Sequence, residues 1–296
     1  MSAITDTASL STAARKRRRQ AKEKYTAGEV VAMAVTGLLV VLVSLPVVYA
    51  LLNSFRSYAE ITRDPMGLPV GLSLDNYVQL FQQTEYGEAV LNTLIITIGS
   101  LLFQVLLLPI AAFGIERIGG GLARFLYLFF IAGLMIPFQV RMIPLVSTMN
   151  DVGLYGTLTS VILVHIGGGA AFGILLYCSF LKTVPIEVEE AAEMDGAGKM
   201  RTFWRIVFPM LMPVTSAFVI MQALGLWNDF FIPLVFLDSS SAGTINVALN
   251  RMVGLLTSRW ELIYTGAILT IIPSVILFAG FQRFFIKGMA LGAVKG

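Results

Sequence analysis

Few side chains in this 296-residue chain could perform covalent chemistry. It contains one histidine, His165, and one cysteine, Cys178, so a metal site built from several His and Cys ligands is impossible within it. The sequence lacks the phosphate-binding pattern G-x-x-x-x-G-K-[ST], and it also lacks the H-E-x-x-H and G-x-S-x-G patterns of hydrolytic enzymes. We therefore expect no catalytic residue, no metal and no cofactor.

The more informative residues are polar groups inside long apolar runs. At about 1.5 Å per residue along a helix, Gln104, His165 and Gln222 fall near the middle of their runs. Neutral amides and aromatic rings, such as those of Gln222, Trp227 and Asn228, suit hydrogen bonding and stacking to a hydroxyl-rich solute. Packing between helices explains such residues as well.

Asp229 stands in the same apolar run and differs from the amides because a carboxylate inside a membrane is costly. Arg141, at a similar depth in another run, is its expected partner. An ion-coupled carrier would use such a carboxylate as a proton relay, but such carriers are built from internal repeats. The two halves of this sequence show no similarity to each other.

The elements that must position these residues are membrane-spanning helices. Hydrophobic residues make up 56% of the chain and charged residues 13%, with a mean hydropathy of +0.80, whereas soluble domains carry about 25% charged residues. A span needs about 20 apolar residues. We expect an all-α polytopic membrane protein whose transmembrane domain, residues 29–296, has six transmembrane helices, at 29–52, 90–114, 122–146, 157–181, 213–237 and 262–285.

Residues 1–28 form a basic tail that precedes the first expected span. Such a cluster is typical of a topology signal, and it is too small to indicate nucleic-acid binding. With this tail inside, 16 of the 21 Lys and Arg residues fall on the cytoplasmic side of the six spans. We therefore expect both termini in the cytoplasm and the chain in the cell (cytoplasmic or inner) membrane.

Residues 183–212 join two expected spans and are too long for a simple connection, because connections in helical bundles are usually about 2–8 residues. Pro185 and Gly196 bound a short acidic helix. A second helix should follow, with an apolar stripe at i, i+3, i+4 and i+7 formed by Met200, Phe203, Trp204 and Val207.

The acidic helix combines two alanines with the carboxylates of Glu187, Glu190 and Glu193. A small-residue face bordered by charge lets a protein partner approach closely and fixes its register. A hairpin lying on lipid headgroups is the alternative, but an anionic leaflet attracts Lys and Arg rather than Glu.

The same segment resembles the EAA loop of ATP-binding-cassette importer permeases, E-A-A-x3-G-x9-I-x-L-P. The matching residues are Glu190, Ala191, Ala192, Gly196, Ile206 and Pro209. Phe208 stands where that pattern has leucine. The run Leu-Trp-Asn-Asp-Phe at 226–230 and the carboxyl-terminal residues 287–296 are similar to the carbohydrate-uptake branch, and within it to the smaller, maltose-type second permease.

This resemblance implies the fold of a binding-protein-dependent importer permease, a non-catalytic subunit that forms half of a sugar pathway. The implied partners are a second, similar permease in a heterodimer, two ATPase subunits, an extracytoplasmic substrate-binding protein, membrane lipid and a sugar, with no nucleic acid. An importer of a non-sugar solute is the alternative. The implied ATPase-coupling residues are Glu190, Ala191, Ala192, Asp195 and Gly196, and the expected pathway residues are Gln222, Trp227, Asn228 and Asp229.

Residues 53–89 and 238–261 form the two sizeable external loops, and the second is too apolar for a solvated linker and too short to span. Either it is a short helix resting on the outer rim, or, as in some maltose-type relatives, it enters the cleft of the binding protein. Asn250, Arg251 and Met252 are the expected binding-protein contacts.

Overall fold

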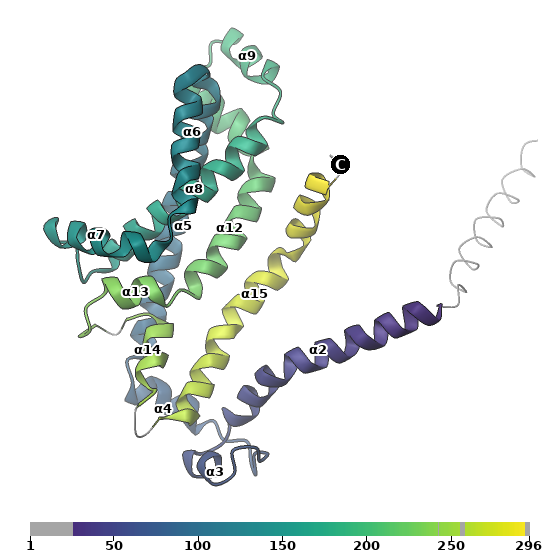
Figure 1. Ribbon diagram of the computed structural model, residues 1–296, viewed down its shortest axis with the longest axis vertical. Helices are drawn as coiled ribbons and strands as arrows, with labels where there is room; N and C mark the ends of the chain where they lie inside the picture. Colours follow the sequence, from purple (N-terminus) through teal and green to yellow (C-terminus); the bar gives the residue numbers. More distant parts are fainter. Residues whose placement is uncertain (1–25, 242, 255–257, 294–296) are drawn as a thin grey trace, which may run out of the picture. The chain divides into compact units, whose positions relative to one another are not determined.

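The computed structural model describes residues 26–241, 243–254 and 258–293, with side chains described as far as Gly280. The predicted basic tail up to residue 25, residues 255–257 of the second external loop, and residues 294–296 of the carboxyl-terminal motif lie outside the described residues. The described elements are helices, together with one isolated β-bridge between Gly156 and Leu237 (Figure 1).

The helices follow one another along the chain with short connections. Their bounds are α2 (Ala27–Asn53), α3 (Tyr58–Arg63), α4 (Asp75–Gln83), α5 (Tyr86–Ile118), α6 (Gly120–Met135), α7 (Phe138–Asp151), α8 (Leu158–Leu181), α9 (Glu187–Met194), α10 (Lys199–Thr202), the π-helix η1 (Phe203–Val207), α11 (Phe208–Met210), α12 (Met212–Trp227), α13 (Phe231–Phe236), α14 (Ile245–Arg251) and α15 (Trp260–Ala293).

The chain divides into two compact units, residues 1–50 and 51–296. The first contains most of α2, a 27-residue helix with a hydropathy of 2.6 whose apolar side chains are exposed. A helix that is apolar on every side needs lipid or another helix around it.

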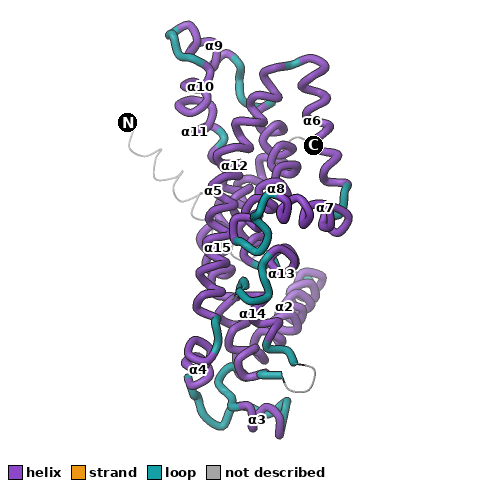
Figure 2. The backbone as a smooth tube through the Cα atoms, turned by 90° about the vertical axis from the view of Figure 1, so that its left-hand side faces the viewer, coloured by secondary structure: helices purple, strands orange, loops and turns teal. Residues whose placement is uncertain are grey.

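The second unit carries the remaining candidate membrane spans. Four helices in the described chain are long and apolar enough to cross a membrane: α2, α5, α8 and α15. The number rises to six if each of two bent pairs is one span, α6 with α7 and residues 199–210 with α12. The all-α, membrane-spanning class predicted from the sequence is therefore confirmed. Figures 1 and 2 place α9 at one end of this unit and α3 and α4 at the other.

Two of the six expected spans, which contain Pro137 and Pro233, are broken in the structure. The segment expected at 122–146 bends by 105° between α6 and α7. Pro137 causes this break, because proline forces the residue before it, Ile136, into extended backbone and cannot donate to a continuing helix.

The segment expected at 213–237 stops at Trp227 and resumes as α13. Polar side chains favour the break, since Asn228 Nδ2 donates to the Leu224 carbonyl at 2.9 Å and Asp229 Oδ1 accepts from the Phe231 backbone N–H at 3.1 Å. The predicted pathway residues Asn228 and Asp229 therefore lie in a turn between two helices.

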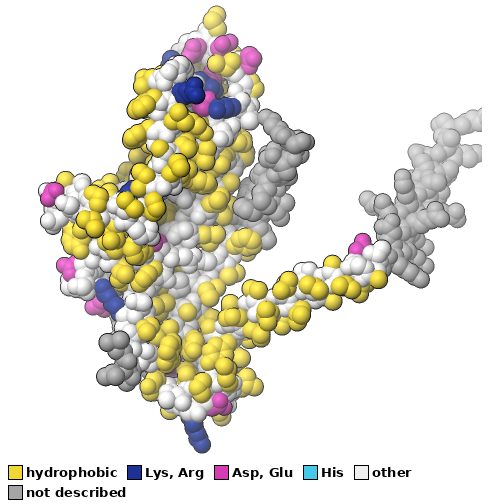
Figure 3. All heavy atoms as spheres, in the orientation of Figure 1, with side chains coloured by type: hydrophobic (Ala, Val, Ile, Leu, Met, Phe, Trp, Pro, Cys, Tyr) yellow, Lys and Arg dark blue, Asp and Glu magenta, His cyan; other side chains and the backbone are white. Residues whose placement is uncertain are grey.

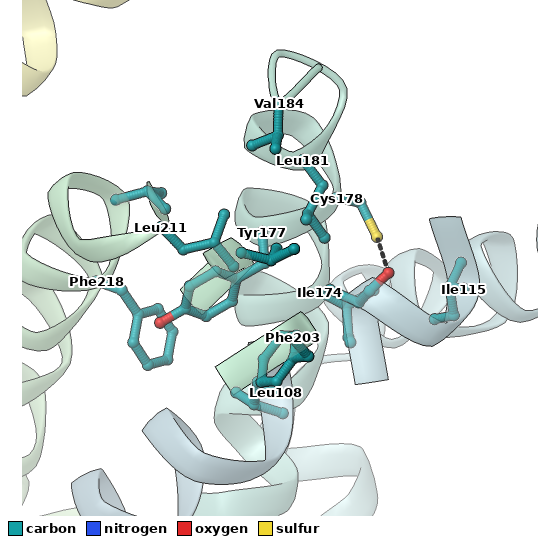
Figure 4. Close-up of a cluster of buried hydrophobic side chains, with 13 residues drawn as sticks. Leu108, Ile115, Ile174, Tyr177, Cys178, Leu181, Val184, Phe203, Leu211 and Phe218 are labelled. Atoms are coloured by element: carbon teal, nitrogen blue, oxygen red, sulfur yellow. Dashed lines mark hydrogen bonds between the residues drawn. The ribbon is translucent and has the colours of Figure 1, made fainter. Parts of the chain in front are cut away.

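The largest hydrophobic cluster joins α5, α8 and α12 to residues 183–212, the connection between two expected spans (Figure 4). Tyr177, Cys178 and Leu181 of α8 are fully buried in it, and so are Val207 of η1 and Leu211. Cys178 acts here as a small buried apolar residue. Because side chains of residues 183–212 belong to the same core as the spans, this connection cannot move independently of the spans.

Candidate coupling and translocation sites

Helix α9 presents one face to solvent and buries the other. Glu190 and Ala191 are exposed, and Met194 beside them is 88% exposed. Ala192, another expected coupling residue, is only 6% exposed. The methyl group of Ala192 lies on the face of α9 that contacts the bundle, and its burial helps to hold α9 in place.

Glu189 fixes α9 to the bundle, although no pattern in the sequence distinguishes it from the other glutamates of α9. Its carboxylate accepts from Arg117 at the end of α5, with Nε 2.9 Å from Oε2 and Nη2 2.5 Å from Oε1. The two side chains are 9% and 20% exposed. A bidentate, partly buried ion pair of this kind fixes both the distance and the orientation of α9 relative to the end of α5.

Gly196 ends α9 as predicted, with φ of +81°. Its N–H donates to the Glu193 carbonyl, and the Ala197 N–H donates to the Ala192 carbonyl, each at 2.9 Å. This pair of hydrogen bonds is the Schellman arrangement, in which the left-handed residue is usually glycine because a Cβ is disfavoured there. Asp195 and Gly196 are both exposed at the tip of the hairpin.

Of the four residues in the predicted apolar stripe, Phe203 and Val207 are fully buried and Trp204 packs beside them, whereas Met200 is exposed. Residues 203–207 form a π-helix, whose wider turn changes the register that an α-helical stripe assumes. Phe203 packs on Phe113 of α5 with ring centroids 5.2 Å apart, and Arg117 lies over the same Phe113 ring. The end of α5, α9 and η1 are thus linked by contacts that share Arg117 and Phe113.

Charged side chains gather around α9 on the face drawn in Figure 3, while hydrophobic ones cover α6 below it. This distribution matches a helix tip in water next to spans in lipid.

The three polar residues expected in mid-membrane come together in the structure. Gln104 Nε2 of α5 donates to the His165 carbonyl of α8 at 2.8 Å, and Gln222 Nε2 of α12 donates to Gln104 Oε1 at 3.2 Å. Gly169 makes room for both amides, because a Cβ there would lie 2.3 Å from Gln104 Nε2 and 2.5 Å from Gln222 Nε2. Gln222 therefore joins helices to one another.

Asp229 does not pair with Arg141 as expected. Its Oδ2 lies 3.3 Å from Nε2 of His165 on α8. Arg141 lies on α7 beyond the bend at Pro137, with its guanidinium over the Phe138 ring at 6.0 Å. The bend carries Arg141 away along a different direction from the one that a continuous span would give it.

Trp227, another expected pathway residue, is 4% exposed, and its Nε1 donates to the Thr270 carbonyl at 3.0 Å. It packs with Leu80, Tyr86 and Ile245 in a second cluster. Its indole therefore stabilises the packing of α12 against α15, while Asn228 next to it is exposed.

The expected binding-protein contacts lie at the end of α14. Asn250 and Arg251 are exposed, and Arg251 Nη1 donates to the Ser241 carbonyl at 2.6 Å. Met252 is half-buried against the cluster around Trp227. The loop thus contains a short ordered helix, as one of the two interpretations of its sequence requires.

Known proteins share this sequence and this fold. The family model described as the binding-protein-dependent transport system inner membrane component matches residues 108–291. The chain is 31% identical over 250 residues to the probable starch degradation products transport system permease protein AmyC of Thermoanaerobacterium thermosulfurigenes, covering 84% of this chain and 91% of that protein. It is 33% identical over 259 residues to the multiple sugar-binding transport system permease protein MsmG of Streptococcus mutans, covering 86% and 93%.

Its fold is similar to a chain of a bacterial ABC transporter involved in the import of the acidic polysaccharide alginate, with a TM-score of 0.77, 20% identity, and coverage of 89% of this chain and 100% of that one. The chain belongs to the binding-protein-dependent transport system inner membrane component family, the membrane-spanning, non-catalytic permease subunits of ATP-binding-cassette importers.

Proposed function

We propose that this chain is one of two permease subunits in an ATP-driven sugar importer, with both termini in the cytoplasm. The second permease is a similar chain in a heterodimer, two ATPase subunits bind on the α9 side, and an extracytoplasmic binding protein delivers the sugar to the opposite end. The names of the relatives support a sugar as the substrate, since they refer to starch degradation products and to multiple sugars.

The coupling role is supported by the way in which α9 is attached to the bundle. Its exposed tip, with Glu190, Ala191 and Met194, is joined rigidly to α5 through Glu189 and Arg117. A partner that moves this tip must move the end of α5 with it. The buried side chains of η1 extend the same connection toward α12.

Transport then follows from a rigid-body movement. ATP brings the two ATPases together, each carries a coupling helix with it, and the attached spans tilt so that the central pathway opens outward. Hydrolysis and release of the nucleotide reverse the movement.

Helix α12 supplies the wall of the pathway in this proposal. Met221, Gly225 and Asn228 are exposed at i, i+4 and i+7 along one face of this helix and its C-cap, while residues on the other face are buried. Asn228 contributes a neutral amide suited to sugar hydroxyls, and Asp229 lies half-buried behind it on His165. The second permease would supply the opposite wall.

Reconstitution of the co-purified complex into proteoliposomes tests this function. With the binding protein present, we expect uptake of at least one of maltotriose, raffinose and arabinotriose that requires ATP and is unaffected by a proton or sodium gradient. Uptake driven by an ion gradient without ATP would refute the proposal in favour of a secondary carrier. ATP-dependent uptake of methionine but of no sugar would keep the importer and refute its substrate class.

A further inference from the structure

An open cavity of about 340 Å³ lies where the turn after α12 meets α14. It is lined by Asn228, Phe230, Asn246, Leu249, Asn250, Val253 and Ile263. Three of these seven residues are asparagines, one is aromatic, three are aliphatic, and none is charged. The cavity joins an expected pathway residue, Asn228, to an expected binding-protein contact, Asn250.

Helix α14 is held firmly in place beside this cavity. The Ile245 backbone N–H donates to Thr93 Oγ1, and Asn92 Nδ2 donates to the Gly243 carbonyl, each at 3.0 Å. Leu249 packs directly on Gly266 of α15, where a Cβ would lie 2.3 Å from Leu249 Cδ2. These contacts tie α14 to α5 and α15, so the side chains on its open face are well positioned.

The three amides are brought together by the turn between α12 and α13. Asn246 Nδ2 lies 3.5 Å from the Trp227 carbonyl and 3.4 Å from the Asp229 carbonyl, which places it beside Asn228. Asn250 follows one helical turn after Asn246 on the same face of α14.

The amides keep unused hydrogen-bonding capacity. Asn228 Nδ2 donates to the Leu224 carbonyl and lies 3.4 Å from Ser274 Oγ, but the side-chain oxygen of Asn228 has no partner among the described residues. The same holds for the side-chain oxygen of Asn246 and for the whole amide of Asn250 in that part of the chain.

We propose that this cavity is a subsite for one ring of a neutral sugar, at the outer mouth of the pathway. Amide oxygens and N–H groups complement the hydroxyls of such a ring, while Phe230 and the aliphatic wall of Leu249 and Ile263 match its C–H face. The absence of charge from the lining disfavours an ionic ligand, whose desolvation nothing here would offset.

The volume lies at the lower end of the range of about 300–1,000 Å³ that small-molecule pockets occupy. The inference rests on the proposed sugar importer and deepens it. In this subsite Asn246 contacts the sugar, and Asn250 contacts the sugar instead of the binding protein.

Equilibrium binding of radiolabelled sugar to the complete importer in lipid nanodiscs, without the binding protein, tests this subsite. The probe is whichever of maltotriose, raffinose and arabinotriose the wild-type complex transports. We expect Asn250→Leu to weaken sugar binding by about 3- to 10-fold, the usual consequence of losing one or two neutral hydrogen bonds. Asn250→Gln should restore part of it, and Asn150→Leu on the exposed end of α7 is the matched control.

A second measurement separates the sugar from the binding protein. The affinity of the unloaded binding protein for the Asn250→Leu complex should stay within about twofold of wild type, while the ratio of uptake rates between two sugars changes. An equal loss of binding-protein affinity, with that ratio unchanged, overturns the subsite and leaves Asn250 as a protein contact. Unchanged sugar binding, or a transporting wild type that binds no sugar, also overturns it, whereas a wild type that transports no sugar refutes the proposed function itself.

Discussion

Replacing Glu189 by glutamine should release α9 from the bundle. The carboxylate accepts from two Arg117 nitrogens, at 2.9 Å and 2.5 Å, with side chains 9% and 20% exposed. Hydrogen bonds to charged groups contribute about 1.5–3 kcal/mol each. Glutamine keeps one neutral acceptor and Arg117 retains some water, so we expect a loss of about 2 kcal/mol, or roughly 30-fold in the equilibrium between attached and detached α9.

A cysteine introduced at Ala192 reports this equilibrium directly, because that position is 6% exposed and the one native cysteine, Cys178, is fully buried. In membranes freed of ATPase, maleimide labelling of Ala192→Cys proceeds through local opening, so its rate should rise about 30-fold in the Glu189→Gln background. Arg117→Met should raise it similarly, and the double variant should fall well short of the product of the two effects.

Lys182→Met provides the control for the labelling experiment. It removes a second contact at the same end of α5, in which Lys182 lies 3.9 Å from Glu116 but is 62% exposed. Exposed pairs contribute about 0–1 kcal/mol, so labelling should change by less than about fivefold. A rise below threefold in Glu189→Gln, or effects that multiply fully in the double variant, would refute the attachment of α9 through this pair.

Other variants test other parts of the structure. Gly196→Val should abolish uptake at normal membrane levels, because a β-branched residue at φ of +81° costs about 1–3 kcal/mol and disturbs the hairpin tip; wild-type uptake would show that the tip tolerates another geometry. Gly169→Ala should lower the melting temperature of the purified complex, since its Cβ would lie less than 3 Å from the amides of Gln104 and Gln222, and Gln104→Ala should partly restore it. An unchanged melting temperature would contradict the close packing of α5, α8 and α12 at Gly169. Deletion of residues 2–14 should leave uptake intact, because these residues precede both the basic cluster that is expected to set topology and the first expected span; uptake lost without loss of membrane insertion would indicate a partner contact in the tail.

The sequence sufficed for the fold class and for the hairpin at 183–212, because both depend on local patterns. Long apolar runs predict spans, and the spacing of Pro185, Gly196 and the following apolar residues predicts two short helices. Gly196 adopts the positive φ that its place at the helix end required.

The pairings between elements could not be predicted, because they depend on how the helices rotate and bend. Glu189 and Glu190 are neighbours of the same chemical type, and only the packing of α9 on α5 decides which carboxylate faces Arg117. The sequence shows Pro137, but it does not show the size of the bend, 105° between α6 and α7, that separates Arg141 from Asp229. Asn246 could not be identified from the sequence, because its place in the cavity depends on a turn that brings α14 beside the end of α12.

The ratio of sugar imported to ATP hydrolysed by the Glu190→Lys complex tests the central claim most directly. Glu190 is exposed on α9, so the substitution places a cation on the docking face without disturbing the core. We expect wild-type amounts of the protein in the membrane, ATP hydrolysis that the loaded binding protein no longer stimulates, and an uptake-to-hydrolysis ratio at least tenfold below wild type. A wild-type ratio in this variant and in Gly196→Val would contradict the assignment of α9 as the helix that couples the permease to its ATPase.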